Sequence, residues 1–144
     1  MILAIILTIC GIVLHMVEGA LDAVCDTIQH HHNKSILPNN NWWNKTGWRN
    51  KYIDRNPANG RVQWDLKLFK MNKPVQLTDA WHFFKMWKII VGELATTISG
   101  SIAVIGYYSD NMWQIVLGIL MMLSLTGILR NSTFTLFYHK ILIK

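Results

Sequence analysis

Four ionisable residues recur at every fourth position in the N-terminal part of the chain: Glu18, Asp22, Asp26 and His30. Residues four apart share one face of an α-helix, so the spacing predicts a stripe of three carboxylates that ends in an imidazole. Neighbouring carboxylates in such a stripe repel each other by roughly 0.2–0.5 kcal/mol per pair in water, and by more near lipid. The stripe therefore requires a metal ion or basic side chains to offset its charge.

A second polar group lies in the C-terminal half. Asp79 and His82 are three residues apart, and Glu93 follows eleven residues after His82, close to the same helix face. If the two helices run antiparallel, Glu18 meets Glu93 at the deepest level, and Asp26 with His30 lies level with Asp79 and His82. The pattern predicts a two-helix cluster of carboxylates and imidazoles at one end of the helices.

Such a cluster has the ligand types of a divalent metal site. Carboxylates favour Mg²⁺ or Mn²⁺, and imidazoles favour Zn²⁺ or Fe²⁺. The Asp-x-x-His spacing resembles one copy of the Glu-x-x-His motif of two-metal helix bundles, which needs two copies. The expected metal ligands are Glu18, Asp22, Asp26, His30, His31, Asp79, His82 and Glu93.

Two alternatives concern these same residues. The stripe could be neutralised without any metal, by the long basic side chains of Arg49, Lys51, Lys85 and Lys88. His15, deeper in the first apolar run, is expected to be a packed side chain rather than a ligand.

The helices that must carry these residues are predicted to cross a membrane. Apolar runs cover residues 2–17, 89–109 and 111–129, and the second and third reach the roughly 20 residues that a spanning helix needs. The first run reaches that length if its helix continues through the acidic stripe. We therefore expect an all-α membrane protein with spans near 2–26, 86–108 and 111–130, the second helix beginning near Asp79. The alternative for the first run is a cleaved signal peptide, but no basic residue precedes it and no small-x-small site follows it.

The distribution of basic residues predicts the orientation. Eleven of the fourteen Lys and Arg residues lie between the first and second apolar runs, and the other three lie at the C-terminal end. Basic segments are retained in the cytoplasm, so we expect an inner-membrane protein with its N-terminus outside and its long loop and tail inside. The net charge of +6 then indicates attraction to anionic headgroups, not nucleic-acid binding.

The long loop, residues 33–78, is expected to form an ordered cap at the headgroup level, because Trp beside Lys is favoured there. Its stretch 61–69 (RVQWDLKLF) has the partial alternation of a short strand. Arg49, Asn50 and Lys51 combine cationic and amide groups that suit the oxygens of a phosphate. These three are the expected substrate-binding residues.

The series Asp22, Asp26, His30, His31, then Trp42-Trp43-Asn44, Asn50-Lys51-Tyr52 and Asp79-Ala80-Trp81-His82 resembles an uncharacterised family of short bacterial and phage-borne integral membrane proteins. The resemblance covers residues 18 to about 85 and implies no activity. The spacing Gly19-x-x-Asp22-x-x-x-Asp26 is also similar to the second half of the metal-binding motif of CDP-alcohol phosphotransferases. The first half of that motif is absent, so this second likeness is a chemical analogy only.

The leading expectation is a metal-dependent enzyme that hydrolyses or transfers a lipid or isoprenoid phosphate at the cytoplasmic face, with Asp22, Asp26 and His82 as catalytic residues. The alternative is a non-catalytic membrane protein that binds a partner complex or forms a homo-oligomer. Small residues that permit close helix packing support this alternative: Gly92, Ala95, Ser99, Gly100, Ala103 and Gly106. A pore is less favoured, because the third apolar run has almost no polar residues to line one.

Overall fold

The structure is a computed structural model that describes residues 2–47, 49, 55–59, 79–120 and 126–143. Within these residues the chain forms helices and no strand, apart from one isolated bridge between Ser35 and Ile143. The expected all-helical class is confirmed for this part of the chain. The stretch 61–69 lies outside it.

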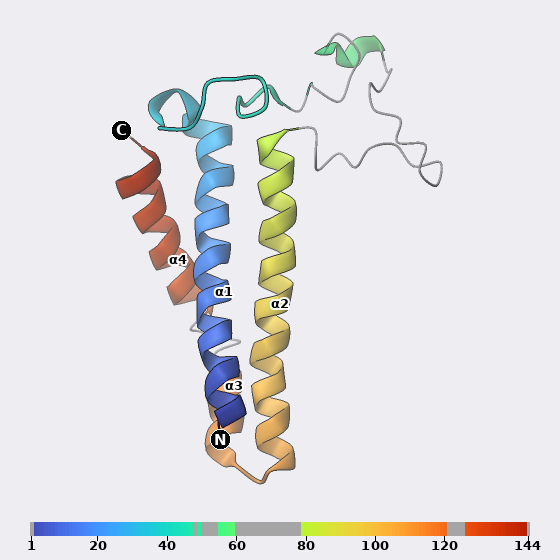
Figure 1. The fold of residues 1–144 in the computed structure, drawn as a ribbon, viewed down its shortest axis with the longest axis vertical. Coiled ribbons are helices and arrows are strands. Elements are labelled where there is room, and N and C mark those ends of the chain that lie inside the picture. Colours follow the sequence, from blue (N-terminus) through green and yellow to red (C-terminus); the bar gives the residue numbers. More distant parts are fainter. Residues whose placement is uncertain (1, 48, 50–54, 60–78, 121–125, 144) are drawn as a thin grey trace.

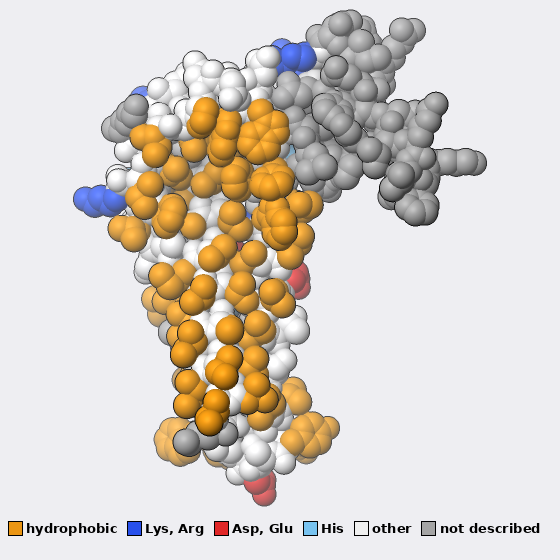
Figure 2. Space-filling model, viewed as in Figure 1, with side chains coloured by type: hydrophobic (Ala, Val, Ile, Leu, Met, Phe, Trp, Pro, Cys, Tyr) orange, Lys and Arg blue, Asp and Glu red, His pale blue; other side chains and the backbone are white. Residues whose placement is uncertain are grey.

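Two long helices, α1 (Ile2–Asp26) and α2 (Ala80–Tyr108), run antiparallel side by side (Figure 1). Both are long and apolar enough to cross a membrane, with mean hydropathies of 2.2 and 1.7. Only 22% and 28% of their most apolar windows are buried inside the protein. Hydrophobic side chains instead cover the outer face along the whole length of the helices (Figure 2). A bilayer would cover this surface.

Helix α1 continues without a break through the acidic stripe, as the sequence predicts. Helix α2 begins at Ala80, also as expected. Its N-cap is Asp79, whose backbone is extended and whose carboxylate Oδ1 accepts a hydrogen bond from the backbone amide of His82, with an N···O distance of 3.1 Å. We call the end of the bundle where α1 ends and α2 begins the loop end.

At the opposite end the chain reverses through Ser109–Asn111 into α3 (Met112–Leu120). Helix α3 packs closely on α2 at Gly118, which has no side chain to hold the helices apart. A Cβ added to Gly118 would lie 2.5 Å from the amide nitrogen of Ala103. Ala95, Ser99 and Gly106 are buried as well. Part of the small-residue stripe that supports an oligomer is thus already buried within one chain.

Helix α4 (Thr126–Leu136) returns along the other side of α1 and continues as the π-helix η9 (Phe137–Leu142). Gly19 lets α4 approach, because a Cβ there would overlap the backbone carbonyl of Arg130. The third expected span, 111–130, is described in α3 and the first residues of α4, and 121–125 lie outside the described residues. A continuous third span therefore stays a prediction.

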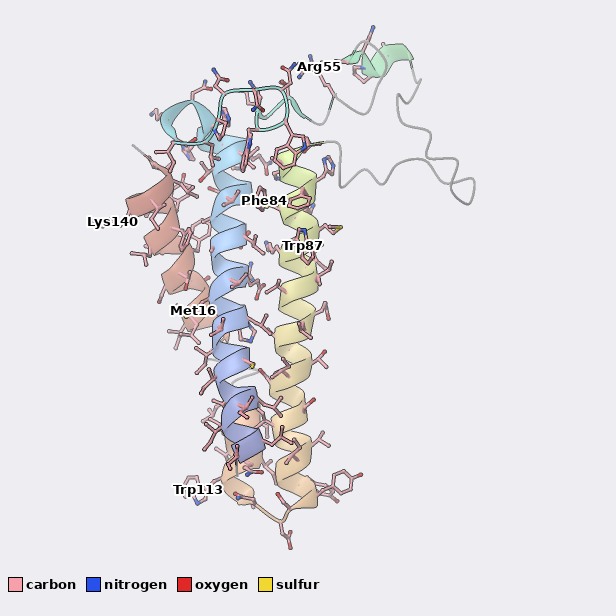
Figure 3. All side chains as sticks on the ribbon, in the orientation of Figure 1. Met16, Arg55, Phe84, Trp87, Trp113 and Lys140 are labelled. Carbon is pink, nitrogen blue, oxygen red and sulfur yellow. The ribbon has the colours of Figure 1, made fainter. Side chains whose placement is uncertain are left out.

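The loop end is closed by ordered chain. Helix α1 passes into a π-helical turn, η1 (Thr27–His31), and a 3₁₀ turn, η2 (His32–Lys34). Residues 36–47 then lie over the start of α2, where the amide of Ala80 donates to the carbonyl of Trp42 at 2.9 Å. Phe84 and Trp87 project from α2 in this region (Figure 3), and the Trp42 ring contacts Phe84 with centroids 6.4 Å apart. A short 3₁₀ turn, η5 (Pro57–Asn59), is another described part of the expected cap.

Candidate functional site

Asp22 stands at the junction of three helices. Its Oδ1 accepts from Nζ of Lys88 on α2, and its Oδ2 accepts from Nη2 of Arg130 on α4, both at 2.6 Å. Each oxygen is thus held by a cation from a different helix. Such charge-assisted hydrogen bonds are short and roughly twice as strong as neutral ones. Asp22 therefore ties α2 and α4 to α1.

Glu18 lies one turn deeper along the same stripe. Its Oε1 is 3.3 Å from Nη1 of Arg130, and its Oε2 is 3.4 Å from Nδ1 of His15. The carboxylate also faces Gly92 of α2, where a Cβ would lie 3.1 Å from it. We call the five linked side chains His15, Glu18, Asp22, Lys88 and Arg130 the ion-pair network.

A cavity of about 470 Å³ opens beside the ion-pair network, and we call it the interhelical cavity. Side chains from α1, α2 and α4 line it. The cavity is lined by His15, Glu18, Lys88, Ile89, Gly92, Glu93, Thr96, Gly127, Arg130 and Asn131. Its volume is within the range of small-molecule sites, about 300–1,000 Å³.

Two buried polar atoms of residues that line this cavity have no hydrogen-bond partner among the described residues. His15 is only 2% exposed, and its Nε2 accepts and donates no hydrogen bond there. The Nε of Arg130 is likewise buried and unpartnered. Buried polar atoms are normally hydrogen-bonded, so these two are exceptions among the described residues. Both are covered by the surrounding protein, so neither faces the cavity.

After Asp22 the residues of the stripe are more exposed and have no close basic partner among the described residues. Asp26 is 36% exposed and lies 4.0 Å from His30, which is 55% exposed. The π-helical turn η1 begins just after Asp26, and within it His31 packs its ring edge against Tyr138 of η9. The buried histidine of the triplet is His32, whose Nε2 lies 3.2 Å from the carbonyl oxygen of Pro38. Spacing alone favours His30 and does not single out His32.

Asp79 and His82 form a separate pair at the loop end. Oδ2 of Asp79 lies 2.7 Å from Nδ1 of His82, and Asp79 is 1% exposed. A carboxylate that holds one imidazole nitrogen orients the other nitrogen, as in many metal-ligating and proton-transferring histidines. The pair thus combines a helix cap with an oriented imidazole.

The predicted antiparallel register is reproduced at its deep end, where Glu18 and Glu93 both line the interhelical cavity. Among the described residues, however, no three His, Cys, Asp or Glu side chains lie close enough together to hold a metal ion. The expected ligands thus form no group of three within the described residues, and a bound metal stays a prediction. We assign no step to a metal here.

Arg49 lies on the exposed surface, and Asn50 and Lys51 lie outside the described residues, so the expected phosphate site stays a prediction. The spacing of the acidic and histidine residues did not identify Arg130. The sequence used this residue only as evidence for the orientation of the chain in the membrane. A single Arg at the edge of an apolar run was the available clue, since such a cation needs a carboxylate partner. Lys88 agrees with the metal-free alternative, which named it as a counter-ion.

The three-helix junction thus combines a neutralised acidic stripe with a polar cavity between otherwise apolar helices. Comparison with known proteins gives no match to a family model, to a curated protein or to a solved structure.

Proposed function

We propose that this protein is a multi-pass membrane protein that binds the polar headgroup of a membrane lipid in the interhelical cavity. The observation that carries the proposal is the position of this polar cavity, between helices whose outer surfaces are apolar. Intramembrane ionisable residues are costly and mark ligand sites and pathways. The ion-pair network would place hydrogen-bonding groups where a headgroup could reach them.

The mouth of the cavity supports a lipid rather than a soluble ligand. Ile89 on α2 lines the cavity and is 54% exposed, and Ile128 on α4, the chain neighbour of the lining residue Gly127, is 63% exposed. Acyl chains could lie along these residues while the headgroup enters the cavity. A soluble ligand would leave them without apolar contact.

The basic loop and tail favour an inner-membrane location with the loop end at the cytoplasmic face. Lys88 lies eight residues into α2, which is about 12 Å from its start at the rise of an α-helix. If the loop end lies at the cytoplasmic face, this depth supports a cavity in the half of the bilayer nearer the cytoplasm. The ligand would come from that leaflet.

Gly127 offers a direct test. It lines the cavity, and a Cβ added there meets no atom within 4 Å. Gly127→Phe should therefore obstruct the cavity without a clash, and Gly127→Ala is the matched control. We expect Gly127→Phe to reduce co-purifying lipid at least fivefold, measured by native mass spectrometry of the full chain, and Gly127→Ala to retain it.

Thr96→Phe should obstruct the same cavity from α2. It provides an independent test in case Gly127→Phe fails to fold. Wild-type amounts of bound lipid in both aromatic variants would contradict the proposal.

A second candidate is the metal-dependent hydrolase or transferase of a lipid phosphate. The Asp79–His82 pair favours it, because the buried carboxylate orients the imidazole. Elemental analysis of the purified full chain tests this candidate. A stoichiometric divalent metal that is lost in His82→Asn would support it, and the absence of metal would exclude it.

A further inference from the structure

Another cavity lies at the loop end and shares no lining residue with the interhelical cavity. Its volume is about 320 Å³, and we call it the basic cavity. It is lined by the three consecutive histidines His30, His31 and His32, by Lys34 and Lys45, and by two side-chain amides. Among the described residues that line it, none is Asp or Glu. With neutral imidazoles, the two lysines give this lining a formal charge of +2.

The two lysines belong to segments that the fold brings together. Lys34 ends the 3₁₀ turn η2, and Lys45 lies in residues 36–47, which cross the loop end over the start of α2 (Figure 1). The buried His32 holds the turn between these segments, because its Nε2 lies 3.2 Å from the carbonyl oxygen of Pro38. Both lysines thus stand on hydrogen-bonded backbone on either side of one cavity.

Neither lysine has an acidic partner among the described residues. The ion pairs formed there include neither Lys34 nor Lys45. Asp26 lies beside the set, with its Oδ1 4.0 Å from Nε2 of His30. Even with this carboxylate counted, the formal charge of the set stays positive, at +1. The basic cavity therefore favours an anionic ligand.

The donors of the basic cavity suit a phosphate better than a metal ion. Within the described residues its histidines do not come close enough together to hold a metal, and the two ammonium groups repel a cation. Each ammonium offers three N–H donors, and the amides and imidazoles add further ones. A terminal phosphate has three acceptor oxygens and a charge between about −1.5 and −2 at pH 7. It can therefore accept hydrogen bonds from both segments at once.

We propose that the basic cavity binds a terminal phosphate group, with Lys34 and Lys45 as its charged contacts. The histidine and amide N–H groups are further donors to the same phosphate. The phosphate belongs either to a lipid of the phosphatidic acid type or to a soluble phosphate ester, which present the same chemistry to the cavity. The proposal is independent of the lipid site between the helices, since the two cavities have no lining residue in common.

The experiment removes one cation at a time from the full chain in detergent. Lys34→Gln and Lys45→Gln act on the basic cavity, and Lys140→Gln is the matched control, because it makes the same change at an exposed lysine of η9 outside the cavity. Binding of dioleoyl phosphatidic acid is measured by native mass spectrometry, and binding of glycerol 3-phosphate by isothermal titration calorimetry. Glycerol 3-phosphate carries the same terminal phosphate without acyl chains.

We expect Lys34→Gln and Lys45→Gln each to weaken binding of the phosphate probe about fivefold, because one exposed charge-assisted contact is lost. Lys140→Gln should bind as the wild type does, and Lys45→Arg, which keeps the charge, should retain most of the affinity. A lysine-dependent loss for phosphatidic acid alone would assign the cavity to the lipid. The same loss for glycerol 3-phosphate would assign it to a soluble phosphate ester.

Two results would overturn the proposal. One is binding of both probes that Lys34→Gln and Lys45→Gln leave unchanged, or that Lys140→Gln weakens equally. The other is a loss of the lysine-dependent binding in Gly127→Phe, which would place the phosphate in the interhelical cavity. Failure of the proposed headgroup site is distinguishable, because it would leave the lysine-dependent binding intact.

Discussion

The ion-pair network and the Asp79–His82 pair both contain carboxylates and imidazoles, yet they are built in different ways. In the network, groups from three helices meet, and Asp22 contacts cations that are 66 and 108 residues away in the chain. At the loop end, Asp79 and His82 are neighbours on one helical turn. The network can hold the bundle together, and the loop-end pair fixes only the start of α2. Substitutions in the two regions should therefore differ in their effect on the unfolding free energy.

The largest loss is expected for Arg130→Ala, since Glu18 and Asp22 would both lose their guanidinium partner. Breaking a fully buried ion pair costs about 3–5 kcal/mol. Arg130 is 36% exposed, so solvent reduces the expected loss to about 2–3 kcal/mol. Equilibrium unfolding in mixed micelles measures it. Lys140→Ala on η9 is the control, and equal losses in the two variants would contradict the network.

Gly19→Ala should cost about 2 kcal/mol, because the added methyl group overlaps the backbone of Arg130 and pushes α4 away. Gly127→Ala makes the same chemical change at the cavity, where the added methyl group meets no atom within 4 Å, and should be neutral or slightly stabilising. Thermal unfolding of the two variants in detergent tests this difference. Similar melting temperatures would show that α4 does not pack on α1 as described.

Asp22→Asn and Asp26→Asn compare two positions on one stripe. Asp22 has two cations at 2.6 Å, whereas Asp26 is 36% exposed and 4.0 Å from His30. We expect a loss of about 1–2 kcal/mol at Asp22 and less than about 0.5 kcal/mol at Asp26. The same unfolding assay applies. A larger loss of unfolding free energy at Asp26 than at Asp22 would contradict this difference and indicate that the carboxylates of the stripe act together.

The smallest effect is expected at the loop end. Asp79→Ala removes the cap of α2 and should cost about 1 kcal/mol, whereas Asp79→Ser keeps a capping oxygen and should recover most of it. Hydrogen exchange at the amide of His82 reports the cap directly. Unchanged protection of that amide in Asp79→Ala would contradict the capping role.

Local spacing predicted the parts of this molecule that depend on neighbours in the sequence. The period of four placed Glu18 and Asp22 on one face of α1, and the cap signal at Asp79 located the start of α2. The π-helical turn after Asp26 was not predictable from that period, and it begins where the stripe loses its partners. Arg130 was missed for a physical reason: its pairing depends on the approach of α4 to α1, which Gly19 permits and no local pattern encodes.

The central claim is that Arg130 and Lys88, rather than a metal ion, neutralise the acidic stripe. A double-mutant cycle between Asp22→Asn and Arg130→Gln, with unfolding measured in the presence and absence of a chelator, tests it most directly. We predict a coupling energy of about 1–2 kcal/mol, because the two side chains lie 2.6 Å apart, and no effect of the chelator. Additive single losses together with a stability that falls on chelation would contradict the claim.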